Sequence, residues 1–169
     1  MNTAALLWQP AYIGVGSNLS DPAAQVRQAC EALAQLAECR LVAVSALYLN
    51  PPLGPQDQPD YVNAAAGLLT TLRPTALLDS LKEIERSQGR ARKAGDRWGP
   101  RIIDLDLLVY GNAVVQEPGL TVPHPGISER NFVLFPLLDI APTLNIPGQG
   151  VVADLAASCS QRDIERLNN

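Results

Sequence analysis

The chain has 169 residues, long enough for one domain with a proper core, and we expect residues 1–169 to form that single domain. Its hydrophobic content of 47% and mean hydropathy of +0.03 exclude a disordered chain and a membrane-spanning one. The net charge of −4 argues against a general nucleic-acid binder. The three cysteines lack metal-ligand spacing, and the first ten residues lack the features of a signal peptide, so we expect a cytoplasmic protein with reduced cysteines.

The first two thirds of the chain predict an alternation of strands and helices. Strands are expected over residues 11–15, 40–49, 61–71 and 102–110. Helices are expected over residues 24–36 and 74–88, with Asp21-Pro22 and Pro74 as typical helix starts. The order β-α-β-β-α-β predicts an α+β fold with a ferredoxin-like core, an antiparallel sheet with helices on one side. Beyond Gly111 we expect an extra hairpin strand near Val114, a short helix over residues 129–138 and a C-terminal helical piece.

The stretch RWGPRIIDLDLLVYG places two carboxylates in the middle of an apolar strand. Side chains alternate faces along a strand, so Asp104 and Asp106 should point the same way. Val109 should share the opposite, apolar face with Leu105 and Leu107. Like charges this close raise each other's pKa or need a cation between them, and a divalent ion carrying substrate phosphates suits them. The alternative is a solvated strand face or an ion pair with an arginine just upstream, and D-x-D spacing alone does not decide between them.

A basic segment precedes the strand with the two aspartates. Six of the thirteen Lys and Arg residues lie within the sixteen positions from Arg86 to Arg101. In an acidic protein such a cluster predicts binding of a compact anion, such as a nucleotide triphosphate, and the alternative is a solvated run of charge. The interspersed glycines favour a loop over a helix face. Neither a complete dinucleotide fingerprint nor a P-loop motif is present, so arginine side chains and metal would have to hold the phosphates.

Two other stretches combine an aromatic ring with polar groups. Tyr61 and Asn63 share a strand face after the proline-rich loop 50–60, and they offer a ring for stacking and an amide that both donates and accepts. The alternative is a core tyrosine and an asparagine next to a turn. His124, the only histidine, precedes Arg130 and Phe132 in HPGISERNF. A lone histidine is more often structural, but this string favours contact with an anion.

The resemblance to a known family rests on five stretches, which together span residues 12–137: YIGVGSNL, PPLGPQDQPDYVNA, QGRARK, RWGPRIIDLDLLVYG and LTVPHPGISERNFVLFPL. They resemble the 6-hydroxymethyl-7,8-dihydropterin pyrophosphokinases of folate biosynthesis. The run from Arg97 to Leu108 matches the family signature, a basic residue followed by G-P-R-x-x-D-L-D, which is far more specific than D-x-D. The resemblance implies transfer of pyrophosphate from ATP to the hydroxymethyl group of the pterin, with AMP as the other product.

The same resemblance implies a role for each candidate residue. Asp104 and Asp106 would hold two Mg²⁺ ions that bridge the ATP phosphates. Four residues of the basic segment would close over the site and complete the catalytic set: Arg90, Arg92, Trp98 and Arg101. The pterin would be bound by Asn50, Pro51, Leu53, Tyr61, Asn63 and Phe132, with the two rings on either side of it. The ATP side would be lined by Glu85, Leu107, Thr121, His124 and Arg130.

Two rival functions come from other classes. An RNA-binding module of ferredoxin-like fold would use the arginine segment, but it needs exposed aromatic residues in its strands, and the predicted strands do not show that pattern. A regulatory domain that binds a small molecule without catalysis is disfavoured by the pair of aspartates. We therefore expect a monomeric enzyme whose partners are ATP and the pterin, with no nucleic acid and no membrane.

Overall fold

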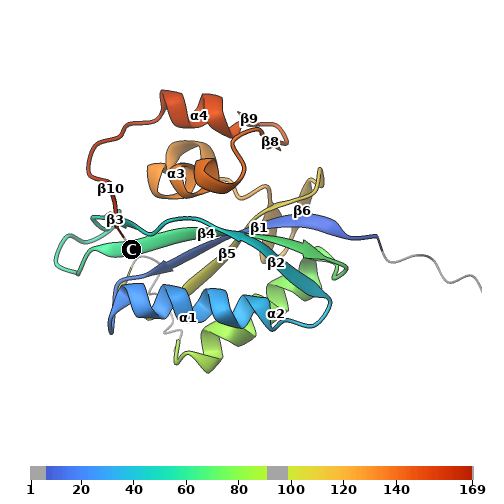
Figure 1. The fold of residues 1–169 in the computed structure, drawn as a ribbon, viewed down its shortest axis with the longest axis horizontal. Helices are drawn as coiled ribbons and strands as arrows, with labels where there is room; N and C mark the ends of the chain where they lie inside the picture. Colours follow the sequence, from blue (N-terminus) through green and yellow to red (C-terminus); the bar gives the residue numbers. More distant parts are fainter. Residues whose placement is uncertain (1–6, 91–98, 169) are drawn as a thin grey trace, which may run out of the picture.

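A computed structural model describes residues 7–90 and 99–168, in which strands and helices alternate (Figure 1). The strands are β1 (Gln9–Ser17), β2 (Cys39–Val44), β3 (Tyr48–Asn50), β4 (Tyr61–Thr70), β5 (Asp104–Tyr110), β6 (Val115–Glu117), β7 (Leu120–Val122), β8 (Asn145–Ile146), β9 (Gly150–Val151) and β10 (Glu165–Arg166). The helices are α1 (Pro22–Ala34), α2 (Pro74–Ser87), α3 (Asn131–Ile140) and α4 (Val152–Ser158), with a 3-10 turn at Ile127–Glu129 before α3.

An antiparallel sheet organises these elements. Strand β4 lies in its middle, where it pairs with β1 along one edge and with both β2 and β3 along the other. Strand β5 pairs with the free edge of β1, and β10 extends the sheet beyond β3. Two short hairpins, β6–β7 and β8–β9, are separate from this sheet. The fold is therefore a mixture of helices and antiparallel sheet, which confirms the predicted α+β class.

Helices lie on both faces of the sheet. Figure 1 shows α1 and α2 against one face and α3 and α4 against the other. Each face has its own apolar cluster: Ile13 and Leu68 pack with residues of α1 and α2, whereas Ala65 and Leu108 pack with residues of α3 and α4. The two helices of the predicted β-α-β-β-α-β order thus share one side, and the C-terminal part of the chain covers the other.

The first two helices begin where the sequence predicted. Asp21 caps α1, because its Oδ1 accepts a hydrogen bond from the N–H of Ala24 at 3.2 Å, and Pro22 is the first helical residue. Pro74 begins α2, which buries Leu77 and Leu81 completely against the sheet. Within the two described ranges, no helix is both long and apolar enough to cross a membrane.

The prediction of one strand over residues 40–49 was wrong, because this segment divides into β2 and β3. At Ser45 the backbone N–H donates to the carbonyl of Ala65, and the Ser45 hydroxyl accepts from the N–H of Ala65, both at 2.9 Å. The next N–H, that of Ala46, donates to Asp139 Oδ2 on α3 at 3.1 Å, and the Tyr48 hydroxyl donates to Oδ1 at 3.0 Å. One carboxylate therefore ties the break in the strand to α3, which an apolar pattern does not reveal.

Strand β5 departs from the predicted alternation at its far end. It begins at Asp104, and its pairing with β1 shifts between Leu107 and Val109, so that Leu108 is the extra residue of a β-bulge. Beyond the bulge the two faces exchange. Val109 lies with Leu108 in the cluster under α3 and α4, so its predicted place beside Leu107 was wrong. Both carboxylates precede the bulge and are unaffected by it.

Replacing Asp139 by alanine should destabilise the protein by about 1–3 kcal/mol, because two donors lose a charged acceptor. Burial, followed by the hydrogen bond to Asp139, raises the pKa of Tyr48 to about 12. Unfolding in urea measures the change. The matched control is Asp79→Ala, at an exposed position of α2, which should shift stability by less than about 0.5 kcal/mol. Equal effects of the two substitutions would contradict this account of the strand break.

Candidate active site

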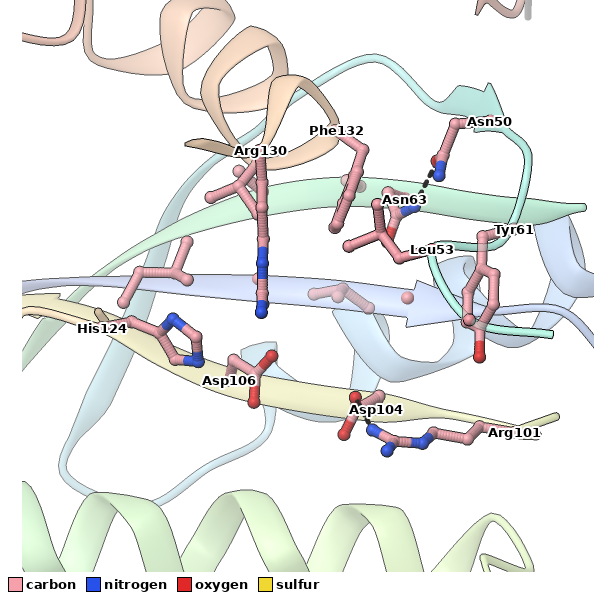
Figure 2. A pocket seen from close by; sticks show the side chains of 18 of the residues that line it. Asn50, Leu53, Tyr61, Asn63, Arg101, Asp104, Asp106, His124, Arg130 and Phe132 are labelled. Atoms are coloured by element: carbon pink, nitrogen blue, oxygen red, sulfur yellow. Dashed lines mark hydrogen bonds and ion pairs between the residues drawn. The ribbon is translucent and has the colours of Figure 1, made fainter. Parts of the chain in front are cut away.

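A cavity of about 330 Å³ opens at the meeting point of β1, β4, β5, the proline-rich loop and the start of α3 (Figure 2). Gly14 and Gly16 of β1 form part of its wall, where a Cβ at each glycine would meet the side chains of Leu108 and Asn63 respectively. The predicted site residues that line the cavity are Asn50, Leu53, Tyr61, Asn63, Arg101, Asp104, Asp106, His124, Arg130 and Phe132. Residues far apart in the sequence are therefore brought to one place.

One end of the cavity carries rings and amides. Tyr61 and Asn63 lie at the start of β4, and Phe132, from the first turn of α3, points toward the same end (Figure 2). The amide Nδ2 of Asn63 donates to Asn50 Oδ1 at 2.6 Å, and Asn50 Nδ2 donates to the carbonyl of Pro51 at 2.9 Å. Because Asn50 is only 5% exposed, these bonds hold both amides in one orientation. This end suits a flat heterocycle with polar edges.

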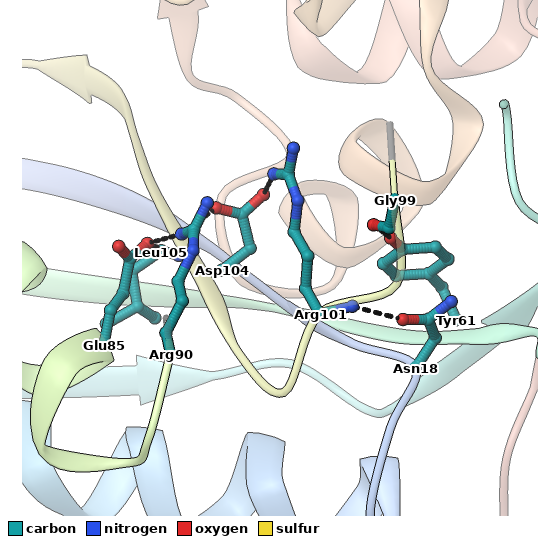
Figure 3. A network of polar contacts seen from close by, with 8 residues as sticks. All are labelled: Asn18, Tyr61, Glu85, Arg90, Gly99, Arg101, Asp104 and Leu105. Atoms are coloured by element: carbon teal, nitrogen blue, oxygen red, sulfur yellow. Dashed lines mark hydrogen bonds and ion pairs between the residues drawn. The ribbon is translucent and has the colours of Figure 1, made fainter. Parts of the chain in front are cut away.

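The other end carries charge. Asp104 and Asp106 both face the cavity from β5, as the alternation predicted (Figure 2). Each oxygen of Asp104 pairs with an arginine: Oδ1 accepts from Arg90 at 2.5 Å, and Oδ2 accepts from Arg101 (Figure 3). The ion pair that the sequence left open as an alternative is therefore present for Asp104 and Arg101.

Glu85 lies behind this charged end and does not line the cavity. It belongs to α2 and is only 3% exposed. Its Oε1 accepts from the N–H of Leu105 at 2.8 Å and pairs with Arg90 (Figure 3). Since Arg90 also contacts Asp104, the three side chains form a chain of ion pairs that fixes α2 against β5.

Asp106 is an unfavourable place for a negative charge. Burial is the main cause that raises its pKa, and the carboxylates of Asp104 and Glu85 add to it. Arg101 and Arg130 oppose the effect, and the resulting pKa is about 7. None of the described residues donates a hydrogen bond to the Asp106 carboxylate. A cation in the cavity would stabilise its charged form.

The aspartate pair fits a hard divalent ion. Mg²⁺ prefers oxygen ligands and is usually held by one or two carboxylates together with substrate phosphates. The described part of the chain contains no cluster of three or more His, Cys, Asp or Glu residues that could hold a metal by protein ligands alone. Asp104 and Asp106 therefore suit an ion that arrives with a phosphate ligand.

His124 and Arg130 reach the charged end from the loop before α3 (Figure 2). The N–H of His124 donates to the carbonyl of Leu108 at 2.8 Å, so the bulge in β5 holds this loop. Burial, and then the positive charge of Arg130, lower the pKa of His124, against a smaller opposing effect of Asp104. At neutral pH a neutral imidazole and a guanidinium thus both face the cavity, and both can donate to an anion.

Several predicted residues do not line the cavity. Pro51 is exposed on the proline-rich loop, and Thr121 is exposed on β7. The side chain of Leu107 is only 4% exposed and packs in the main core. Arg92 and Trp98 lie outside the described residues, as does most of the basic segment that was expected to close over the site.

Sequence reasoning missed Asn18, which is only 1% exposed. Its Nδ2 donates to Gln58 Oε1 at 3.1 Å and to the carbonyl of Pro59 at 3.0 Å, while its Oδ1 accepts from the N–H of Arg101 at 2.7 Å (Figure 3). Asn18 therefore joins the proline-rich loop to the segment that carries Arg101. The available signal was a Ser-Asn pair directly after a glycine-rich strand.

Comparison with known families and structures agrees with this geometry. The family model described as "7,8-dihydro-6-hydroxymethylpterin-pyrophosphokinase (HPPK)" matches residues 12–142. The chain belongs to the HPPK family. The matched range contains every residue that lines the cavity.

Two HPPK relatives resemble the chain over nearly their whole length. Both are named 2-amino-4-hydroxy-6-hydroxymethyldihydropteridine pyrophosphokinase. The protein from Pseudomonas aeruginosa is 48% identical over 159 residues, which cover 94% of this chain and 97% of the relative. The protein from Haemophilus influenzae is 46% identical over 158 residues, which cover 94% of this chain and 98% of the relative.

Solved structures share the fold at much lower identity. The Plasmodium falciparum HPPK-DHPS A437G structure with pteroate superposes with a TM-score of 0.73 at 12% identity. The match covers 97% of this chain but only 47% of the Plasmodium chain. The wild-type Plasmodium structure gives a TM-score of 0.70 over 90% of this chain. At such identity these matches support the fold alone.

Gly16→Ala should displace Asn63 and weaken binding of a pterin by about tenfold or more, because a Cβ at Gly16 would lie 2.5 Å from Asn63 Oδ1. The matched control is Gly14→Ala on the same strand, whose Cβ would have its nearest contacts with the Leu108 side chain, at 3.4–3.6 Å. Equilibrium titration with a pterin, followed by its fluorescence, measures both. Unchanged affinity in Gly16→Ala would show that the position of Asn63 does not matter for binding.

Proposed function

We propose that the chain transfers the β,γ-diphosphate of ATP to the hydroxymethyl group of 6-hydroxymethyl-7,8-dihydropterin, giving the pterin diphosphate and AMP in folate biosynthesis. Membership of the HPPK family and relatives named for this activity support the reaction. The observation that carries it is the division of one cavity into an end of rings and amides and an end of carboxylates and cations. A flat acceptor and a triphosphate donor need these two environments side by side.

At the first end, Tyr61 and Phe132 would hold the two faces of the pterin. Asn63, oriented by Asn50, would bond the polar edge of the ring. A backbone contact from Pro51 and its neighbours is proposed from the family resemblance alone. Leu53, which is exposed on the proline-rich loop and lines the cavity, would cover the ring once it is bound. This arrangement would leave the hydroxymethyl group directed toward β5.

At the second end, the transfer would be a direct displacement at phosphorus. The hydroxymethyl oxygen attacks the β-phosphorus of ATP and a new O–P bond forms. The bond between the β-phosphorus and the oxygen of the α-phosphate breaks, AMP leaves with that oxygen, and the hydroxyl proton passes to water. Such reactions need positioning and neutralisation of charge more than covalent participation by the protein. Arg101, His124 and Arg130 are placed to donate to the phosphates.

Asp104 and Asp106 would hold Mg²⁺, and we propose two ions. When bound, the metal supplies neutralisation of the charge on the transferred phosphates. The raised pKa of Asp106 and the oxygen-only donor set support this assignment. Arg90 and Glu85 would act behind Asp104 by holding its carboxylate in place. Contacts of Arg92, Trp98, Leu107 and Thr121 with ATP are proposed from the family resemblance alone.

The remaining assignments are also proposals. The strand order β3-β4-β1-β5, with α1 and α2 on one face, supports a ferredoxin-like core, to which the C-terminal strands and helices are added. We propose that residues 1–169 form one domain and act as a monomer in the cytoplasm. Incubation with ATP, Mg²⁺ and the pterin alcohol tests the reaction: AMP should form in proportion to pterin diphosphate, and formation of ADP in its place would contradict it.

Asp104→Asn and Asp106→Asn should each lower the rate of AMP formation by about 100-fold or more, because each removes a carboxylate charge from the proposed metal site. The Asp106→Asn substitution should not lower the stability of the fold. Its pKa is raised from the ordinary 3.8 to about 7, so stability is lost as the pH rises between these two values, and the full cost remains above them. Near pH 8 without metal, the variant should therefore be as stable as the wild type or more stable. Asp79→Asn is the control for a surface change. Near-normal turnover at saturating Mg²⁺ would exclude the metal assignment.

Tyr61→Ala and Phe132→Ala should each weaken pterin binding by about 1–3 kcal/mol, by analogy with the stacking of bases on aromatic side chains. Binding of an ATP analogue should change little. Tyr61→Phe keeps the ring and loses only the hydroxyl, so it is the matched control and should retain pterin affinity. Separate titrations with each ligand measure these effects. Equal losses for the two ligands would mean that the rings serve the core and not the pterin.

A further inference from the structure

Gly126 occupies a position where the backbone does not require glycine. It lies in the loop between β7 and the 3-10 turn, with φ of −93° and ψ of 5°. These angles are open to residues with side chains, so conformational freedom does not explain the glycine. Space does. A Cβ at this position would lie 2.6 Å from Arg130 Cζ and 2.7 Å from Arg130 Nε. The guanidinium of Arg130 therefore fills the place that a side chain at 126 would take.

The backbone of Gly126 makes a second contact with the cavity. Its N–H donates to Nδ1 of His124 at 3.1 Å. Because Nδ1 accepts this bond, the proton of a neutral imidazole must be on Nε2. Figure 2 shows the ring of His124 and the side chain of Arg130 directed toward the region of Asp106. The Nε2–H group is therefore available as a donor at the charged end of the cavity.

The rest of His124 is also fixed. Its N–H is bound to the carbonyl of Leu108 at 2.8 Å, and its own carbonyl accepts from Gln149 Nε2 at 3.2 Å. With both backbone groups held, the ring can be oriented by the single bond from Gly126. Burial and Arg130 lower the pKa of His124, which favours the neutral form in which the choice of tautomer matters.

We propose that Gly126 is a positioning residue for the phosphates of the nucleotide: its N–H selects the Nε2–H tautomer of His124, and its missing side chain seats the guanidinium of Arg130. The identity of the anion rests on the proposed function, whereas the arrangement of Gly126, His124 and Arg130 is independent of it. One glycine thus orients two donors that the sequence places on opposite sides of it.

The binding experiment uses the full chain with Gly126→Ala, and α,β-methylene-ATP with Mg²⁺ as the probe. The dissociation constant of the probe should rise by about tenfold or more, because Arg130 is displaced. Pterin affinity and the thermal unfolding midpoint should stay the same. The matched control is Gly67→Ala in β4, whose Cβ would meet its neighbours at ordinary distances of 3.6–3.7 Å and which does not line the cavity. An unchanged dissociation constant in Gly126→Ala would overturn the seating of Arg130.

A double-mutant cycle separates positioning from a general structural effect. If Gly126→Ala acts by displacing Arg130, it should cause no further loss of probe affinity in an Arg130→Ala background. A loss of the same size in both backgrounds would mean that the alanine disturbs the loop as a whole, and the proposal would be wrong.

The tautomer can be tested without any ligand, because His124 is the only histidine of the chain. The nitrogen resonances of a protein labelled at histidine should show a protonated Nε2 and an unprotonated Nδ1 at neutral pH. A protonated Nδ1 would overturn this half of the proposal. If the wild type forms no AMP but its imidazole has the expected tautomer, the proposed function fails while the role of Gly126 toward His124 stands.

Discussion

The site is organised around two like charges on one strand. The alternation of β5 points Asp104 and Asp106 into the same cavity, and partial burial makes their repulsion costly. The two carboxylates differ in how this repulsion is compensated. Asp104 is neutralised within the protein by Arg90 and Arg101, whereas Asp106 has no such partner among the described residues, and its pKa rises to about 7. The pair is therefore asymmetric: Asp104 is held by two ion pairs, and Asp106 has a raised pKa and no ion pair within the described residues.

Polar ties at the edges of the sheet keep this arrangement in register. Asn18 links the proline-rich loop to the backbone of Arg101, and the Tyr61 hydroxyl donates to the carbonyl of Gly99 at 3.2 Å (Figure 3). Both connect the end of the cavity that suits a heterocycle to the end that suits phosphates. In a displacement reaction the two substrates must meet within a fraction of an ångström, so ties between the two ends matter as much as contacts to either substrate.

The sequence predicted those features that depend on local pattern. The strand and helix order, the helix starts at Asp21 and Pro74, and the shared direction of Asp104 and Asp106 all follow from periodicity or from a residue's own chemistry. Features that depend on a distant partner were not predictable. The break after β2 requires Asp139 from α3, which lies more than ninety positions away in the chain.

The same limit applies within the site. The bulge at Leu108 comes from the pairing of β5 with β1, and its carbonyl is used by His124. The need for glycine at position 126 becomes evident only from the position of the Arg130 guanidinium beside it. Family resemblance supplied candidate roles for these regions, but it did not reveal which residues hold the functional side chains in place.

The balance of charge inside the protein also constrains how a triphosphate can bind. The guanidinium groups of Arg90, Arg101 and Arg130 face the carboxylates of Glu85, Asp104 and Asp106, so their positive charge is largely matched before any ligand arrives. A triphosphate brings several further negative charges to a partly buried place, where uncompensated charge is expensive. Arg90 and Arg101 cannot neutralise it without releasing their carboxylates. Cations that arrive with the nucleotide would resolve the conflict, because they bind the carboxylates and the phosphates at once. Under the proposed function, the described arginines would thus remain paired with carboxylates while metal ions neutralise the phosphates.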